Sequence, residues 1–342
     1  MIRFFIEKII NLENKTINAL EMIPSSSIMN KKPFFSVIVP TYNRAHALQK
    51  SIQSILTQTF QDFEIIIVDD ASTDNTEEVV CSIKDDRIHY FVNEINQERC
   101  ITRNKGIEKA VGEYICFLDS DDYHLPNHLQ VIYEEIQLQN YAKAFYFTNA
   151  WNEDDLGNRS ERCCPDFENE NSYTYFLKFT VNPQRWAVHH SIFEKLKFDN
   201  DVIICEDMDM SLRMLAAGIP VFQIKTRSTV YVAAPDSFTV ADSNKASKEL
   251  FYLKRIFARK ELKGKLEMKE CDRLLSMCYF HLAVKAYDEK KRLTVFSCSA
   301  KSFFLFPQGY NGKTNKILGV MCIYSIPAIG GIMRFMKKSK NK

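Results

Sequence analysis

Glycine is scarce in this chain. Its 342 residues include only ten glycines, and no two of them are separated by a single residue. A dinucleotide-binding G-x-G-x-x-G motif is therefore excluded, and no G-x-x-x-x-G-K-[ST] phosphate loop occurs. Any nucleotide site must use other residues.

Cysteine pairs with metal-binding spacing are also missing. The chain has ten cysteines, none in a CxxC pair, which argues against a zinc ribbon and a thioredoxin-like site. The opening MIRFFIEKII is too short and too interrupted by charge for a cleavable signal peptide. Because scattered thiols fit a reducing compartment, we expect a cytoplasmic protein.

The chain as a whole has no large excess of basic or acidic residues. There are 45 basic and 43 acidic residues, so a protein that coats nucleic acid is excluded. The last nine residues, from Arg334, are a local exception with five basic side chains and no acidic one. An apolar content of 46% is enough for a buried core, and the length suggests about two domains.

Residues 33–150 alternate between apolar runs and helical patterns. Strands are predicted at 34–40, 63–70, 88–92, 113–122 and 142–150. Helical patterns separate them, and Gly112 is expected to end the helix at 101–111. This alternation predicts a Rossmann-like α/β fold, with a mostly parallel sheet and helices on both faces.

The rest of the chain divides where the pattern changes. Residues 1–32 predict a helical appendage and linker. Residues 151–240 predict a second half with a helix at 205–218 and strands near 219–224 and 228–233. Residues 241–342 predict a helical C-terminal region.

Three polar turns follow the ends of predicted strands, at 41–44, 69–70 and 119–122. In open α/β sheets ligands bind at the carboxyl ends of the strands, so these turns should share one edge. Asp119 and Asp121 are the strongest signal, because two carboxylates one residue apart suit Mg²⁺ or Mn²⁺. An acidic turn that only caps the next helix is the alternative reading, and Asp122 is expected to do this.

Four blocks in this order resemble one family: VIVPTYNR (37–44), EIIIVDDASTDNT (64–76), RNKGIEKAVGEYICFLDSDD (103–122) and CEDMDMSLRM (205–214). They are similar to the inverting glycosyltransferases of family 2, which have the GT-A fold. The resemblance covers roughly residues 34–240. It implies an enzyme that moves a sugar from a nucleotide-sugar donor, most simply a UDP-sugar, to a hydroxyl of a glycan or lipid-linked acceptor.

The resemblance also implies roles for single residues. The donor-binding residues would be Pro40, Thr41, Tyr42, Arg44, Asp70, Arg103 and Asp119. Asp121 would ligate a Mn²⁺ or Mg²⁺ ion between the donor phosphates, and Asp207 would be the general base. From the residues alone Glu206 and Asp209 compete with Asp207, so that choice rests on the family.

Two positions depart from the family pattern. Glu98 stands where many relatives carry glycine, a change expected to affect only a loop. Ala234 stands where relatives often have a histidine near the diphosphate or metal, which weakens the case for such a contact from that loop.

The acceptor side has weaker signals. Trp186 is either a stacking platform for a pyranose ring or a core residue. His189 and His190 point to opposite faces of a predicted strand, so at most one of them would face a sugar. His124 and His128 are one helical turn apart, but Pro126 between them favours a first helical turn over a zinc site.

Two other functions remain open from the residues. A nucleotidyltransferase would also use paired carboxylates, but it needs a glycine-rich loop near the first strand, and PTYNRAH contains no glycine. A non-catalytic protein that binds nucleotides or sugars would keep its function after Asp207→Asn.

The C-terminal end predicts membrane contact. Residues 317–333 carry no charge, but the stretch is short for a spanning helix and is interrupted by Pro327 and two glycines. With the basic tail it predicts peripheral attachment to the inner face of the cell membrane. A buried helix pair is the alternative.

Overall fold

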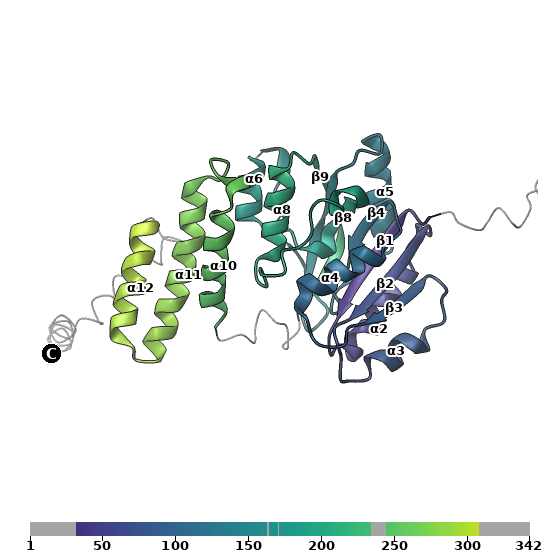
Figure 1. The fold of residues 1–342 in the computed structure, drawn as a ribbon, viewed down its shortest axis with the longest axis horizontal. Coiled ribbons are helices and arrows are strands. Elements are labelled where there is room, and N and C mark those ends of the chain that lie inside the picture. The colour runs from purple at the N-terminus through teal and green to yellow at the C-terminus, as the bar shows by residue number, and fades with distance from the viewer. Residues whose placement is uncertain (1–31, 163, 170, 234–243, 308–342) are drawn as a thin grey trace, which may run out of the picture. The chain divides into compact units, whose positions relative to one another are not determined.

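The computed structural model describes residues 32–162, 164–169, 171–233 and 244–307 (Figure 1). The chain forms two compact units, Met1–Pro33 and Phe34–Lys342, and almost all described residues belong to the second. The predicted appendage at 1–32 and the stretch 317–333 fall outside the described residues, apart from Lys32.

One sheet contains all the strands of the described residues. They are β1 (Phe35–Thr41), β2 (Phe63–Asp69), β3 (Ile88–Val92), β4 (Tyr114–Phe117), β5 (Tyr123–His124), β6 (Phe145–Glu153), β7 (Arg159–Glu161), β8 (Trp186–His189) and β9 (Val221–Val232). Their order is β3-β2-β1-β4-β8-β6-β9-β5, with β7 beside β6. The first four are parallel, as are β6 and β9, whereas β8 runs antiparallel to both of its neighbours. The expected mostly parallel sheet is confirmed.

Helices cover both faces of this sheet, which explains the continuous apolar strands. Along β1 and β2, Val37 and Ile65 join one hydrophobic cluster while Ile38 and Ile66 join the other, because successive side chains point to opposite faces. The first cluster is completed by α2 (Ala45–Leu56), α3 (Thr76–Ser82) and α5 (His128–Leu138). The second is completed by α4 (Glu98–Lys109), α6 (Ser172–Lys178), α8 (Glu206–Ala216), α10 (Lys245–Phe257) and α11 (Met268–Asp288).

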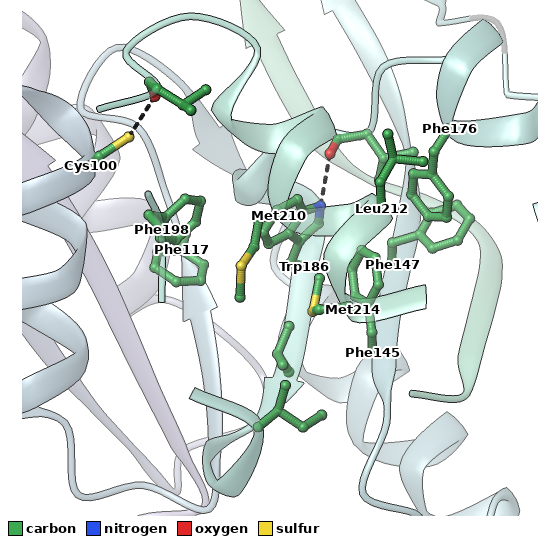
Figure 2. Packing of buried hydrophobic residues seen from close by; sticks show 14 of the residues in the cluster. Cys100, Phe117, Phe145, Phe147, Phe176, Trp186, Phe198, Met210, Leu212 and Met214 are labelled. Carbon is green, nitrogen blue, oxygen red and sulfur yellow. Dashed lines mark hydrogen bonds between the residues drawn. The ribbon is translucent and has the colours of Figure 1, made fainter. Parts of the chain in front are cut away.

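The predicted C-terminal helical extension is present. After α10 and α11 comes α12 (Arg292–Leu305), and α11 packs against α10, α12 and α6 (Figure 1). The short α7 (His190–Phe193) and the 3₁₀ turn η3 (Pro183–Arg185) flank β8. Figure 2 shows the aromatic centre of the second cluster, where Phe117, Trp186 and Phe198 pack beside Met210 of α8.

Two details differ from the predicted elements. The strands expected near 219–224 and 228–233 are one strand, β9, whose pairing with β6 shifts register around Asn149. Gly112 does not end a helix, since α4 stops at Lys109 with Ala110 already extended. Glycine is needed there because a Cβ would lie 2.6 Å from the backbone nitrogen of Ser36.

Candidate active site

The carboxyl ends of β1, β2 and β4 bring the three polar turns to one edge of the sheet. Thr41 pairs with Asp69 at the ends of β1 and β2, and the Asp70 nitrogen donates to the Thr41 carbonyl at 2.9 Å. Pro40 and Thr41 lie at the end of β1, with the Thr41 side chain buried, and the Tyr42 ring is 45% exposed. On the other side of β1, the Leu118 nitrogen donates to the Ile38 carbonyl at 2.9 Å, so the acidic turn starts at the same edge.

Strained backbone is concentrated at this edge. Three non-glycine residues next to expected site residues have left-handed φ angles: Asn43 (50°), Ala71 (63°) and Cys205 (62°). Glu98 (69°) follows Gln97, whose nitrogen donates to Asp70. Such conformations disfavour side chains with a Cβ and are retained at functional sites when surrounding contacts enforce them. Glu98 begins α4 in one of these conformations, which glycine adopts most easily, and the effect of the change from glycine stays a prediction.

Asp70 is buried, and its contacts join the end of β2 to the start of α4. Its carboxylate accepts hydrogen bonds from Asn93 Nδ2 at 2.7 Å and from the Gln97 nitrogen at 2.9 Å. Neither contact caps α3, where Asp74 accepts from Thr76 instead. Asp70 therefore does not cap α3.

Arg103 connects the acidic turn at 119–122 to α8. Its guanidinium is buried and donates through Nη2 to Asp119 Oδ1 and through Nη1 to Glu206 Oε1, each at 2.9 Å. Burial alone would lower the pKa of Arg103, but the two carboxylates raise it above its ordinary value. The acidic turn and the start of α8 are thus held together by one charged side chain.

The three carboxylates at the start of α8 have different partners. Glu206 is paired with Arg103 and lies 3.6 Å from Arg99 Nη1. Asp209 accepts from Arg259 Nη2 at 2.9 Å and lies 3.4 Å from Arg213 Nη1.

Asp207 instead has neutral hydrogen-bond donors, which are Asn182 Nδ2 at 3.1 Å and the Met208 nitrogen at 2.7 Å. Burial, and then the charge of Glu206, raise the pKa of Asp207 to about 7. A carboxylate with this pKa can accept a proton near neutral pH, which a carboxylate paired with arginines does poorly.

Asn182 in turn accepts a hydrogen bond from the Tyr231 hydroxyl, which lies 3.1 Å from Asn182 Oδ1. Asn182 and Tyr231 were not identified as site residues from the sequence, because they are 49 residues apart and no local pattern connects them.

The acidic turn divides into an exposed and a buried carboxylate. Asp121 is partly exposed, with its Oδ2 3.9 Å from Arg44 Nε. Asp122 is buried and accepts from the Val232 nitrogen and from Gln184 Nε2, each at 2.8 Å. Burial, with Asp121 and Asp119 nearby, raises the pKa of Asp122 well above its ordinary value. The expectation that Asp122 caps the next helix is wrong, because its partners are the end of β9 and η3.

Known proteins resemble part of this chain. The model of Glycosyl transferase family 2 matches residues 36–197. The putative colanic acid biosynthesis glycosyl transferase WcaA of Escherichia coli K12 is 32% identical over 190 residues, which cover 55% of this chain and 68% of that protein. The chain belongs to glycosyl transferase family 2. The predicted family and the predicted glycosyltransferase are confirmed, which decides against a nucleotidyltransferase.

Another relative matches a shorter stretch of the chain. The GalNAc(5)-diNAcBac-PP-undecaprenol beta-1,3-glucosyltransferase of Campylobacter jejuni is 43% identical over 116 residues, covering 33% of this chain and 37% of that protein. The chain thus spans between about a third and two thirds of the length of these two curated relatives.

Solved structures resemble the fold. S. aureus TarS 1-349 in complex with UDP-GlcNAc gives a TM-score of 0.58 at 17% identity, covering 89% of this chain and 92% of that one. The mannosyltransferase PcManGT from Pyrobaculum calidifontis, in complex with GDP-Man and Mn²⁺, gives 0.54 at 16% identity, covering 86% and 88%. The expected GT-A-type fold is confirmed.

The sequence predicts a divalent metal ion at this site. Among the described residues, no three His, Cys, Asp or Glu side chains gather where they could hold an ion by themselves. Magnesium-type ions, however, are often held by one or two carboxylates together with substrate phosphates. The partly exposed carboxylate of Asp121 fits that kind of site. Ala234, where relatives often have a histidine, lies outside the described residues.

The structure does not support the expected acceptor-side residues of this glycosyltransferase. Trp186 is fully buried, stacks on Phe198 and donates its indole N–H to the Val181 carbonyl at 2.8 Å (Figure 2). Since β8 is antiparallel to β4, His189 pairs with Tyr114 at the end of β4 opposite the acidic turn. His190 Nδ1 is hydrogen-bonded to the Gly112 carbonyl at that same end.

His124 and His128 form a buried stacked pair with ring centroids 3.6 Å apart. Their partners are the Gln184 carbonyl, at 2.9 Å from His124 Nε2, and Ser228 Oγ, at 2.9 Å from His128 Nδ1. Burial lowers the pKa of both rings, so they are neutral near pH 7. The first helical turn expected here contains only His128, the first residue of α5, because His124 lies in β5.

Proposed function

We propose that this protein is an inverting, metal-dependent glycosyltransferase that moves a sugar from a UDP-sugar to a hydroxyl of a glycan or lipid-linked acceptor. The observation that carries the proposal is Asp207, a buried carboxylate with neutral partners and a raised pKa, one residue from the Glu206–Arg103–Asp119 bridge. Inversion requires one base on the face of the sugar opposite the leaving group, and this arrangement offers one.

In the proposed mechanism, residues 33–150 bind the donor and residues 151–240 bind the acceptor. Pro40, Thr41 and Tyr42 line the base of the nucleotide, near Arg44, and Asp70 accepts from the base or ribose. Arg103 lies by the diphosphate, and Asp119 lies by the ribose. A Mn²⁺ or Mg²⁺ ion held by Asp121 would supply positive charge to the diphosphate.

Asp207 takes the proton from the acceptor hydroxyl, and the hydroxyl oxygen attacks the anomeric carbon of the donor sugar. Asn182 orients the carboxylate of Asp207, and Tyr231 holds Asn182. The nucleoside diphosphate leaves from the opposite face of the sugar. The pairing of Glu206 with Arg103 keeps that carboxylate from competing as the base.

The donor and acceptor classes are supported by relatives. One structural neighbour was solved with UDP-GlcNAc and another with GDP-Man. Of these two nucleotides, we propose the uridine nucleotide as the donor of this protein. The Campylobacter relative is named for a polyprenyl diphosphate-linked acceptor. A thermal-shift screen of nucleoside diphosphates and nucleotide sugars with Mn²⁺ tests the donor, because a ligand that binds the folded state raises its melting temperature. No shift with any nucleotide would contradict the proposal.

The general base is tested with Asp207→Asn. We expect turnover to fall by about a thousandfold or more while donor binding, measured by the same thermal shift, is retained. An Asp207→Asn variant with nearly full turnover would instead favour the non-catalytic alternative or another base.

The metal ligand is tested by comparing Asp121→Ala with Asp122→Ala. The first should remove Mn²⁺-dependent nucleotide binding without changing the melting temperature of the free protein. The second should lower that melting temperature, because the Val232 nitrogen and Gln184 lose a buried partner. Equal effects of the two variants would contradict the assignment.

The C-terminal tail is proposed to hold the enzyme at the inner face of the cell membrane. None of the described helices is both long and apolar enough to span a bilayer. The proposal rests on the uncharged stretch 317–333 and the basic residues after it. Fractionation of the full chain beside a chain ending at Thr314, in low and high salt, tests it. If both stay in the supernatant at low salt, the tail does not bind membranes.

A further inference from the structure

Charge is distributed very unevenly along the chain. From Lys290 to Lys342 there are eleven basic residues and no acidic one. The net charge of +2 therefore combines +11 after residue 289 with −9 before it. The basic region begins well before the uncharged stretch, at the turn that leads into α12.

The same region carries an exposed apolar stripe on α12. Leu293 is 87% exposed, Phe304 is 80% exposed, and Phe296 and Phe303 are each 45% exposed. At about 100° per residue these side chains lie along one side of the helix. The opposite side holds Val295, Ser299 and Ser302, which are buried.

α12 packs on α11 through that buried side. Ser276 and Ser302 exchange hydrogen bonds at 2.9 Å, and Val295 joins a small cluster with Ala283 and Ala286. The outer stripe of Leu293, Phe296, Phe303 and Phe304 remains exposed. Arg292 and Lys301 of α12 are exposed, as is Lys290 just before the helix, and α12 contains no acidic residue. Lys291 is paired with Glu289 at 2.8 Å.

We infer that this outer stripe of α12 lies on an anionic lipid surface, with the aromatic rings in the headgroup region and the basic residues against the lipid phosphates. An exposed aromatic stripe bordered by Lys and Arg is typical of helices that lie in the plane of a membrane interface. The residues that follow α12 in the sequence are also basic or uncharged. An anionic surface therefore attracts helix and tail together, whereas a second copy of α12 would bring like charges together.

This inference extends the proposed membrane contact from the tail to a folded helix. It does not depend on the transfer chemistry, because nucleotide binding is measured separately. It is also distinct from the tail proposal, because a tail could bind lipid while α12 stayed in water.

The first test uses the full chain and vesicles of phosphatidylcholine with or without phosphatidylglycerol. The variant Phe296→Ser/Phe303→Ser/Phe304→Ser should bind the anionic vesicles at least tenfold more weakly, with its melting temperature and its nucleotide shift unchanged. A control variant, Leu138→Ser/Leu156→Ser, changes two exposed leucines elsewhere and should bind like the parent. Undiminished binding by the triple variant would overturn the inference.

The second test places a probe on the helix. In Phe304→Trp, vesicles with brominated acyl chains should quench the introduced tryptophan, while a Leu156→Trp variant should show no additional quenching. If vesicles sediment with the Phe304→Trp protein but its introduced tryptophan is not quenched, the tail alone binds and the inference fails. It also fails if the triple variant changes the oligomeric state in light scattering but not vesicle binding, since the stripe would then be a contact between copies.

Discussion

Asp207 and Glu206 are adjacent in the chain, but their partners make only Asp207 suitable as the proposed base. Glu206 is paired with Arg103, whereas Asp207 accepts from Asn182 and has its pKa raised by burial and by the charge of Glu206. The sequence could not separate them, because Arg103 is 103 residues away from Glu206 along the chain. The distinction depends on which side of the helix start faces the buried arginine.

This difference predicts the pH dependence of turnover. A base must be deprotonated, so kcat/KM should rise about tenfold per pH unit below a pKa near 7 and level off above it. In Asn182→Asp a second negative charge stands beside Asp207, which should move the inflection to higher pH. A profile that is already flat at about pH 5, or one that Asn182→Asp does not move, would argue against Asp207 as the base.

At Glu98 the backbone conformation determines how the residue affects the stability of the protein. With φ at +69°, it occupies a conformation that costs a non-glycine residue about 1–2 kcal/mol. Glu98→Gly should therefore stabilise the protein by about 1 kcal/mol despite the entropy of glycine in the unfolded chain.

Chemical denaturation of Glu98→Gly measures this gain. Glu108→Gly, in the last turn of the same helix, should have the opposite sign and cost about 1 kcal/mol, because glycine is a poor helix former and the ion pair with Lys197 is lost. Destabilisation by both variants would show that the left-handed geometry at residue 98 does not limit stability.

At the scale of elements, Gly112 shows how tightly the loop after α4 approaches the first strand. Its nitrogen donates to Ser36 Oγ at 2.8 Å, and a Cβ would lie 2.6 Å from the Ser36 nitrogen. Gly112→Ala should therefore destabilise the protein by about 2 kcal/mol, because the backbone of a buried strand must move. The exposed neighbour Val111 provides the control, since Val111→Ala should change the unfolding free energy by less than about 0.5 kcal/mol.

The elements themselves were largely predictable from local pattern. The strand at 88–92 matches β3, the helix at 205–218 corresponds to α8, and the helical region predicted from residue 241 contains α10, α11 and α12. Pairing between distant segments was not predictable. Because β8 is inserted antiparallel between β4 and β6, His189 and His190 lie away from the polar edge. Asp122 was misassigned for the same kind of reason, as Val232 is 110 residues away.

At the scale of the whole molecule, α10 and α11 share a hydrophobic core with the sheet. Leu253 and Ile256 of α10 are buried in the same cluster as Phe117 and Trp186. Just after α10, Arg259 pairs with Asp209 of α8, whose carboxylate is almost fully buried.

Arg259→Met tests this connection between the two regions. Burial already raises the pKa of Asp209, and loss of Arg259 would leave a buried carboxylate with a much weaker partner. The variant should lose about 3 kcal/mol of unfolding free energy in a denaturant titration. Arg255→Met is the matched control, since Arg255 pairs with the exposed Asp201 and should matter by less than about 0.5 kcal/mol. Similar losses in both variants would point to lost packing instead.

The bridge from Asp119 through Arg103 to Glu206 has a consequence for how such enzymes can diversify. It crosses from the half that we assign to the donor to the half that we assign to the acceptor. Recombination could join the first half of one relative to the second half of another. The arginine and the carboxylate of the bridge would then come from two proteins in which they evolved separately. Such a chimera needs an arginine from one parent and a matching carboxylate from the other. New acceptor specificities should therefore arise more readily by changes within residues 151–200 than by exchange of whole halves.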